Sequence, residues 1–295
     1  MFLVFFQSVF AQNSIDNFLK PSDSLNKQRQ NKVIISQAIV VSGALIGLNQ
    51  LWYSDYPKSD FHFVNDNSEW LQMDKAGHFF SSYYLGRMSA EMLQWNGSSR
   101  KNQLVYGAGL GFVFLTAVEV MDGFSSEWGA SMGDVVANAS GTALYVSQEL
   151  IWKEQRITPK FSFHTTQYAN LRPAVLGSTL TEQILKDYNG QTYWLSANVH
   201  SFSKASKIPK WLNLAIGFGA EGMITGNNEN NTTILTPKPV RFRQFYLSFD
   251  ADLTKIRTKS HFLKTLFSVL NTVKIPTPTI EYSAHSGFKF HALYF

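Results

Sequence analysis

The spacing of hydrophobic residues changes near residue 160 of this 295-residue chain. Before that point the apolar segments have the length of helices, and they cover residues 33–53, 73–95, 102–124 and 131–152. After it, short runs such as "FYLSFDADL" alternate apolar and polar residues, as strands do. We therefore predict an α+β protein, with a bundle of about four helices in residues 32–155 and a partly open antiparallel sheet in residues 160–295.

Each predicted helix is close to the ~20 residues that cross the apolar core of a bilayer. Each also contains Gly, Ser, Asn or Gln, and the third has Gly107, Gly109 and Gly111. Small residues let helices approach closely in membranes, and they serve equally well in a tightly packed helical domain. The sequence therefore leaves the number of membrane spans open.

The strand-rich region also has amphipathic elements. In "FYLSFDADL" the apolar residues share one face and the polar residues share the other. Residues 260–274 form an amphipathic helical pattern with Lys264 and Lys274 off its apolar stripe, which is typical of an interfacial helix. Burial of the stripe against the sheet explains the pattern equally well. We expect a sheet that rests on or dips into a membrane, because the strands are too few for a closed barrel of eight.

Composition favours an exported, membrane-associated protein. Aromatic residues make up 15% of the chain and charged residues only 16%, against roughly 25% charged residues in typical soluble domains. The N-terminal apolar run ends in a pattern that suits cleavage after Ala11, so we interpret residues 1–11 as the remnant of a signal peptide. The final Phe295 resembles the C-terminal signal of outer-membrane proteins. We predict a bacterial cell-envelope protein that faces the periplasm, at the outer membrane.

Charge is distributed unevenly along the chain. Residues 160–295 carry 15 Lys and Arg against 7 Asp and Glu, a net charge of +8 within a total of +5. A basic half in an exported protein indicates a surface of anionic lipid or lipopolysaccharide as partner, although ordinary solvent-facing charge is the alternative. No groove-reading motif is present, so we expect no nucleic acid partner.

Polar residues in three of the predicted helices have spacings that place them on one helical face. These pairs are Asp74 and His78, Glu119 and Asp122, and Asp134 and Asn138. Residues three or four apart are neighbours on a helix surface. If the helices pack side by side, the three faces converge on a common pocket.

Some of these residues have ordinary structural explanations. Asp74 is a candidate N-cap, Ser131 and Asp134 fit the spacing of a capping box, and Asp122 precedes a glycine that could end its helix. Glu119 has no such structural explanation, because it lies late in an apolar run with no helix end to cap. A buried carboxylate is costly, so we expect Glu119 to be paired, protonated or in contact with a water-filled pocket. Asn138 likewise lies well inside its helix.

Two kinds of chemistry fit this set. A carboxylate of Asp74 or Glu119 beside His78 would orient the imidazole as a catalytic base or acid. Lys75 would contact an anion, with Asp122, Asp134 and Asn138 as further ligand-binding residues. Alternatively, a histidine and several carboxylates are a plausible set for a divalent metal, and we predict no other cofactor. Hydrolase and phosphate-loop motifs are absent, so whether any reaction takes place is left open.

The order of these residues resembles a known family. Asp74-Lys75-x-x-His78-Phe79, followed by Tyr84, Glu119-x-x-Asp122 and Ser131-x-x-Asp134-x-x-x-Asn138-x-x-Gly141, is similar to uncharacterised predicted periplasmic lipoproteins. It resembles VanZ-like membrane proteins more distantly. The resemblance covers about residues 70–145 and implies a compact helical, membrane-bound domain with no settled reaction. The chain contains no cysteine, so the lipoprotein part of that description is not expected to carry over.

The leading hypothesis is an envelope protein whose helical region holds a buried polar site for a lipid headgroup or a cell-wall precursor. One alternative is a hydrolase or transferase that acts on a lipid-linked phosphate or glycan. The other is a structural component of outer-membrane assembly, with a larger envelope complex as its partner.

Overall fold

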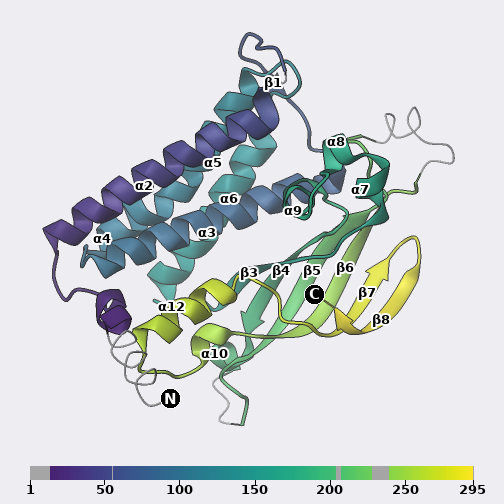
Figure 1. The fold of residues 1–295 in the computed structure, drawn as a ribbon. Coiled ribbons are helices and arrows are strands. Elements are labelled where there is room, and N and C mark those ends of the chain that lie inside the picture. Colours follow the sequence, from purple (N-terminus) through teal and green to yellow (C-terminus); the bar gives the residue numbers. More distant parts are fainter. Residues whose placement is uncertain (1–13, 55, 204–206, 228–238, 295) are drawn as a thin grey trace, which may run out of the picture.

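The computed structural model describes residues 14–54, 56–203, 207–227 and 239–294. A layer of helices lies beside a curved antiparallel sheet, and the N-terminal part of the chain forms most of the helical layer (Figure 1). This arrangement confirms the predicted α+β class. The predicted signal segment, residues 1–11, lies outside the described residues, and so does Phe295.

The helical layer follows the four predicted segments closely. Its elements are α2 (Lys27–Leu48) with the wider turn η1 (Asn49–Tyr53), η2 (Glu69–Gln72), α3 (Met73–Trp95), α4 (Arg100–Asn102), η3 (Gln103–Ala108), α5 (Gly109–Gly123) and α6 (Met132–Ile151). Two short strands, β1 (Phe63–Val64) and β2 (Ala130–Ser131), pair in parallel before α3 and α6. By length and apolar composition, Lys27–Tyr53 and Arg100–Gly123 are long enough to cross a membrane.

Glycines bring α5 and α6 against the backbone of α3. A Cβ atom on Gly111 of α5 would collide with the backbone oxygen of Ser82. A Cβ atom on Gly141 of α6 would collide with the backbone oxygen of Phe79. Only glycine permits these approaches, so α3 is held between its two neighbours and the polar faces of all three helices meet.

The sheet has six antiparallel strands in sequential order. They are β3 (Ile157–Phe163), β4 (Gln191–Asn198), β5 (Leu212–Glu221), β6 (Phe242–Ala251), β7 (Thr277–Ser283) and β8 (Gly287–Tyr294). The connections contain α7 (Gln167–Leu171), α8 (Pro173–Leu176), α9 (Leu180–Lys186), α10 (Val199–Ser203), η4 (Leu253–Lys255) and α12 (His261–Leu270).

The sheet curls so that the segment before β7 reaches the free edge of β3. Residues 272–274 run beside β3, where the Phe161 N–H donates to the Thr272 oxygen at 2.9 Å and the Lys274 N–H donates to the Phe161 oxygen at 2.9 Å. In β8, the Tyr294 hydroxyl lies 2.8 Å from the Tyr246 hydroxyl. The sheet therefore partly encloses an interior.

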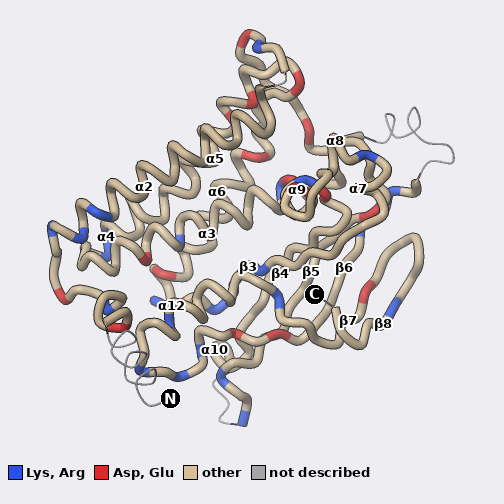
Figure 2. The backbone as a smooth tube through the Cα atoms, in the orientation of Figure 1, with Lys and Arg blue, Asp and Glu red and all other residues tan. Residues whose placement is uncertain are grey.

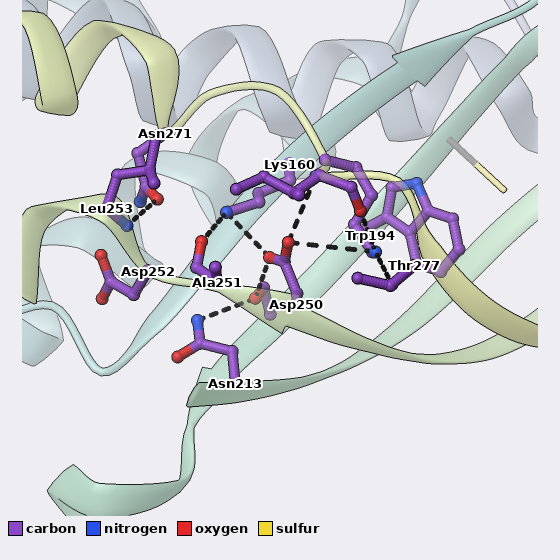
Figure 3. Close-up of polar contacts among 12 residues, drawn as sticks. Lys160, Trp194, Asn213, Asp250, Ala251, Asp252, Leu253, Asn271 and Thr277 are labelled. Carbon is purple, nitrogen blue, oxygen red and sulfur yellow. Dashed lines mark hydrogen bonds and ion pairs between the residues drawn. The ribbon is translucent and has the colours of Figure 1, made fainter. Parts of the chain in front are cut away.

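That interior is polar. Lys160 Nζ lies 2.8 Å from Asp250 Oδ2, and both side chains are fully buried (Figure 3). Lys274 Nζ donates to the oxygens of Phe249 and Ile275 at 2.8 and 2.7 Å, and it is also fully buried. The predicted helix over 260–274 was too long: α12 ends at Leu270, and Lys274 lies inside the sheet instead of at an interface.

The opposite face of the sheet is apolar and largely exposed. Its exposed residues, which we call the outer sheet face, are Leu195, Leu214, Ile216, Phe245, Leu247, Phe249, Ile280, Tyr282, Phe288 and Phe290. In β6 the alternation is complete, because Phe245, Leu247 and Phe249 are exposed while the residues between them are buried. The sheet therefore has its polar side inside and its apolar side outside.

Basic residues gather at one end of the molecule. Figure 2 shows Lys and Arg near the N-terminal end of α2, at α4 and around α12. Burial does not reduce the basic excess of residues 160–295 at the surface, because it removes Lys160 and Lys274 together with four acidic residues, Asp187, Asp250, Asp252 and Glu281.

Candidate functional site

The three predicted polar faces meet at one end of the helical layer. The start of α3, the end of α5 and the start of α6 surround a pocket of about 560 Å³. Its lining includes Asp74, His78, Glu119, Asp122 and Asp134. The sequence spacing therefore identified side chains that the fold brings together, although their roles remain predictions.

An unusual turn places the first residues of α3. Trp70, Leu71 and Gln72 have φ angles of 45°, 50° and 73°, in the left-handed region. The Trp70 N–H donates to the Gly226 oxygen at 2.7 Å, which anchors the turn to the loop after β5. The residue before α3 is Gln72, so Asp74 is not the N-cap and lies within the first turn. Such backbone costs about 1–2 kcal/mol per residue and is often found at functional sites.

Lys75 is held by three carboxylates. Its Nζ lies 2.7 Å from Asp66, 3.0 Å from Asp74 and 3.2 Å from Asp134. Burial alone would raise the pKa of Asp66, but hydrogen bonds from Lys75 and Ser131 bring it below its usual value. All three ammonium hydrogens thus have internal acceptors, and an anion at Lys75 would have to displace one of them.

His78 and Glu119 face each other across the pocket. His78 Nδ1 lies 3.0 Å from Asn138 Oδ1 and 3.6 Å from Glu119 Oε1. The other Glu119 oxygen accepts the Ser131 N–H at 3.0 Å. Burial raises the pKa of Glu119 to about 8, the Ser131 hydrogen bond offsets part of that rise, and nearby Asp134 and Asp122 add smaller increases.

The remaining acidic residues have different partners. Asp122 Oδ1 accepts the Tyr53 hydroxyl at 2.7 Å, and burial raises the Asp122 pKa to about 6. Burial also raises the pKa of Asp74 and of Asp134. The Ser131 hydroxyl accepts the Asp134 N–H at 3.2 Å, so Ser131 caps α6 as its spacing suggested.

Four buried polar atoms of this set have no hydrogen-bond partner. They are Asp74 Oδ1, Glu119 Oε1, Asp134 Oδ1 and Asn138 Nδ2. Buried polar groups are satisfied in the great majority of cases, so four in one place require an explanation. Two trios have donor atoms within 4.8 Å of one another, namely His78, Glu119 and Asp134, and Asp66, Asp74 and Asp134.

The sequence did not predict the rest of the pocket wall. It includes aromatic and acidic residues from loops and distant elements: Trp52, Tyr53, Asp66, Glu69, Trp70, Glu127, Trp128, Tyr188 and Tyr193. Loop residues follow no hydrophobic period, and Tyr188 and Tyr193 lie more than 90 positions after the end of α3. The aromatic pair that ends the first apolar segment, Trp52 and Tyr53, was the one available signal.

An apolar cavity of about 600 Å³ adjoins the polar pocket. It lies between α3 and the sheet, and Phe80 and Tyr193 line both spaces. Its other lining residues include Leu195, Ile216 and Phe245, which belong to the outer sheet face. The apolar cavity therefore shares wall residues with the acidic pocket on one side and with the exposed apolar face on the other.

Residues 60–148 match the model of a family described as "Predicted periplasmic lipoprotein (DUF2279)". Over these residues the match confirms the resemblance predicted from the order of polar residues, and the matched region contains every predicted site residue. The family description agrees with a location in the periplasm of the cell envelope, and the biochemical function of the family is unknown. The match does not bear on the VanZ-like resemblance, which stays a prediction. No curated protein and no solved structure matches the chain.

Proposed function

We propose that this envelope protein binds a single amphiphilic lipid, with the headgroup in the acidic pocket and the hydrocarbon chain in the adjoining cavity. The observation that carries the proposal is that the two spaces lie side by side and share Phe80 and Tyr193 in their walls. A polar cavity beside an apolar one of similar volume, about 560 and 600 Å³, matches the two halves of such a molecule. Pockets of roughly 300–1,000 Å³ are typical of small-molecule sites.

A membrane supplies such a ligand, and the outer sheet face supports a membrane as the protein's setting. Transmembrane barrels likewise direct apolar residues outward and polar residues inward. The apolar cavity reaches this face at Leu195, Ile216 and Phe245, so a lipid chain would enter without crossing water. Basic residues around α12 would contact anionic lipid or lipopolysaccharide. We propose the outer membrane as the membrane concerned.

A second candidate is a hydrolase or transferase that acts on the same lipid. The observation that favours it is the imidazole of His78, which Asn138 and Glu119 orient at 3.0 and 3.6 Å in the pocket wall. A general base fixed by two neighbours is a common catalytic arrangement. Release of a water-soluble headgroup from a lipid-linked phosphate by the parent, and not by His78→Ala, would establish this candidate.

Lipid retention tests the leading proposal. Protein purified in mild detergent would be extracted and the lipid measured by mass spectrometry, with about one molecule per chain expected. Ala76→Trp places a large side chain in the apolar cavity and should reduce retained lipid at least tenfold. Met88→Trp is the control, because Met88 is exposed on the same helix. Equal retention by a folded Ala76→Trp variant would overturn the proposal.

A further inference from the structure

The pocket lacks a positive charge to balance its acidic residues. The described residues that line it include seven carboxyl groups and one histidine, but no lysine or arginine. Lys75 lies behind the wall and is engaged by Asp66, Asp74 and Asp134. A phosphate-bearing headgroup would be repelled by this wall unless a cation accompanied it.

The two trios of possible ligands differ in how far Lys75 already balances their negative charge. In the trio of Asp66, Asp74 and Asp134, the Lys75 ammonium already supplies the cation at 2.7–3.2 Å. In the trio of His78, Glu119 and Asp134, Lys75 contacts only Asp134, at 3.2 Å, and Glu119 Oε1 has the imidazole of His78 at 3.6 Å. Glu119 Oε1 and Asp134 Oδ1 are buried without a hydrogen-bond partner, as is Asp74 Oδ1 of the other trio. Glu119 and Asp134 are 3% and 4% exposed.

We infer that His78, Glu119 and Asp134 bind a divalent transition-metal ion at the wall of the lipid pocket. Their donor atoms lie within 4.8 Å of one another. Ligands at about 2.0–2.2 Å from an ion lie roughly 3–4.4 Å apart, so small side-chain movements complete the site. The second, unpartnered oxygen on each carboxylate is the independent observation that points to an ion.

The types of donor atom indicate which metal ion this site would bind. An imidazole nitrogen with two carboxylate oxygens suits Zn²⁺ or Mn²⁺, whereas Mg²⁺ and Ca²⁺ prefer oxygen ligands alone. Nδ1 of His78 lies 3.0 Å from Asn138 Oδ1 and 3.6 Å from Glu119 Oε1, and the tautomer of the imidazole decides which ring nitrogen offers its lone pair to the ion. Because all three residues line the pocket, the ion would keep open positions toward it, as catalytic and ligand-binding metal sites do.

This inference goes beyond the proposed lipid binding and does not depend on it. The ion would offer a phosphate oxygen of a headgroup a positive partner in an otherwise acidic pocket. The same ion would be bound in the absence of any lipid.

Metal binding would be measured on chelator-treated, delipidated protein by equilibrium dialysis with Mn²⁺ and with Zn²⁺. One ion per chain with a micromolar or lower Kd is expected for the parent. Glu119→Gln and His78→Ala should each weaken binding at least 100-fold. Glu91→Gln on α3 is the matched control, because Glu91 pairs with Arg87 away from the pocket.

Asp122→Asn tests the choice of ligands, since Asp122 lines the same pocket but bonds to Tyr53. Asp122→Asn should change the metal affinity less than threefold. A loss as large as that of Glu119→Gln would show that the acidic wall attracts the ion in general, without a specific set of ligands. Pulsed electron paramagnetic resonance of Mn²⁺ on the parent gives a second readout that needs no variant, and coupling to one imidazole nitrogen is expected. Absence of stoichiometric binding, or of that coupling, would overturn the inference whatever the result for lipid.

Discussion

Lys75 forms ion pairs with three carboxylates, and replacing it with methionine would leave all three without their counter-ion. We expect Lys75→Met to lower the free energy of unfolding by about 3–5 kcal/mol, since removing one partner of a buried ion pair strands the other charges. Chemical denaturation would measure the change, with Lys264→Met at an exposed position of α12 as control. A loss below about 1 kcal/mol would show that the carboxylates do not depend on Lys75.

Lys274 gives a prediction about pH. Burial lowers its pKa from 10.5 to about 8, and the attraction of Asp250 offsets only part of that shift. Between these pH values the unfolded chain keeps a proton that the folded protein has released, so the contribution of Lys274 to stability rises with pH. The free energy of unfolding of the parent, relative to Lys274→Met, should increase by up to about 1.4 kcal/mol per pH unit from pH 8 to 10.5. If the free energy of unfolding depends on pH equally in the two proteins, the lowered pKa of Lys274 is contradicted.

The sequence predicted the site at the level of single residues only where a helix fixed their geometry. Asp74 with His78, and Asp134 with Asn138, share a helical face whatever the tertiary structure, and their convergence required only that α3 and α6 pack together. Asp66 completes the contacts of Lys75 at 2.7 Å but lies in a loop. Its position depends on the β1–β2 pairing and on Ser131, and neither leaves a periodic pattern in the sequence.

At the scale of elements, glycine spacing in α5 leads to a matched pair of substitutions. Gly111→Ala would push a methyl group into the backbone of α3, whereas a Cβ on Gly109 meets nothing within 4 Å. We expect Gly111→Ala to cost about 1–3 kcal/mol through overpacking. Gly109→Ala should be neutral or should stabilise by up to about 1 kcal/mol, because alanine favours helix. Thermal denaturation separates the two, and equal melting temperatures would contradict close packing of α5 on α3.

Helices were easier to predict than strands for a physical reason. The segment that contains Asp74 was expected at 73–95, and α3 spans Met73–Trp95, because polar, turn-forming residues bound this long segment on both sides. Strand β4 was missed, since its buried face carries Thr192, Ser196 and Asn198 while Leu195 is exposed. In most antiparallel sheets the apolar face is buried and the polar face is exposed, and this strand has the opposite arrangement. Alternation alone therefore does not tell which face is buried.

For the whole molecule, a sheet with its polar side inside and its apolar side outside predicts membrane binding that depends on the outer sheet face. Leu247 and Phe249 are 45% and 56% exposed and lie outside the lining of the apolar cavity. Insertion of each side chain into lipid contributes about 1 kcal/mol, so the double change Leu247→Ser and Phe249→Ser should weaken binding to vesicles about tenfold or more. Stability should change little, because both side chains face outward.

Flotation with vesicles of anionic and of neutral lipid, at low and at high salt, would separate the two contributions. The double variant should lose affinity for both kinds of vesicle, since the apolar term does not depend on lipid charge. High salt should weaken binding of the parent only to anionic vesicles, because salt screens the basic residues around α12. The control replaces Leu171 and Leu180, which are 49% and 59% exposed in α7 and α9, away from the sheet. If the control loses as much affinity as the sheet variant, binding is not directed through the outer sheet face, and a lipid would need another route to the pocket.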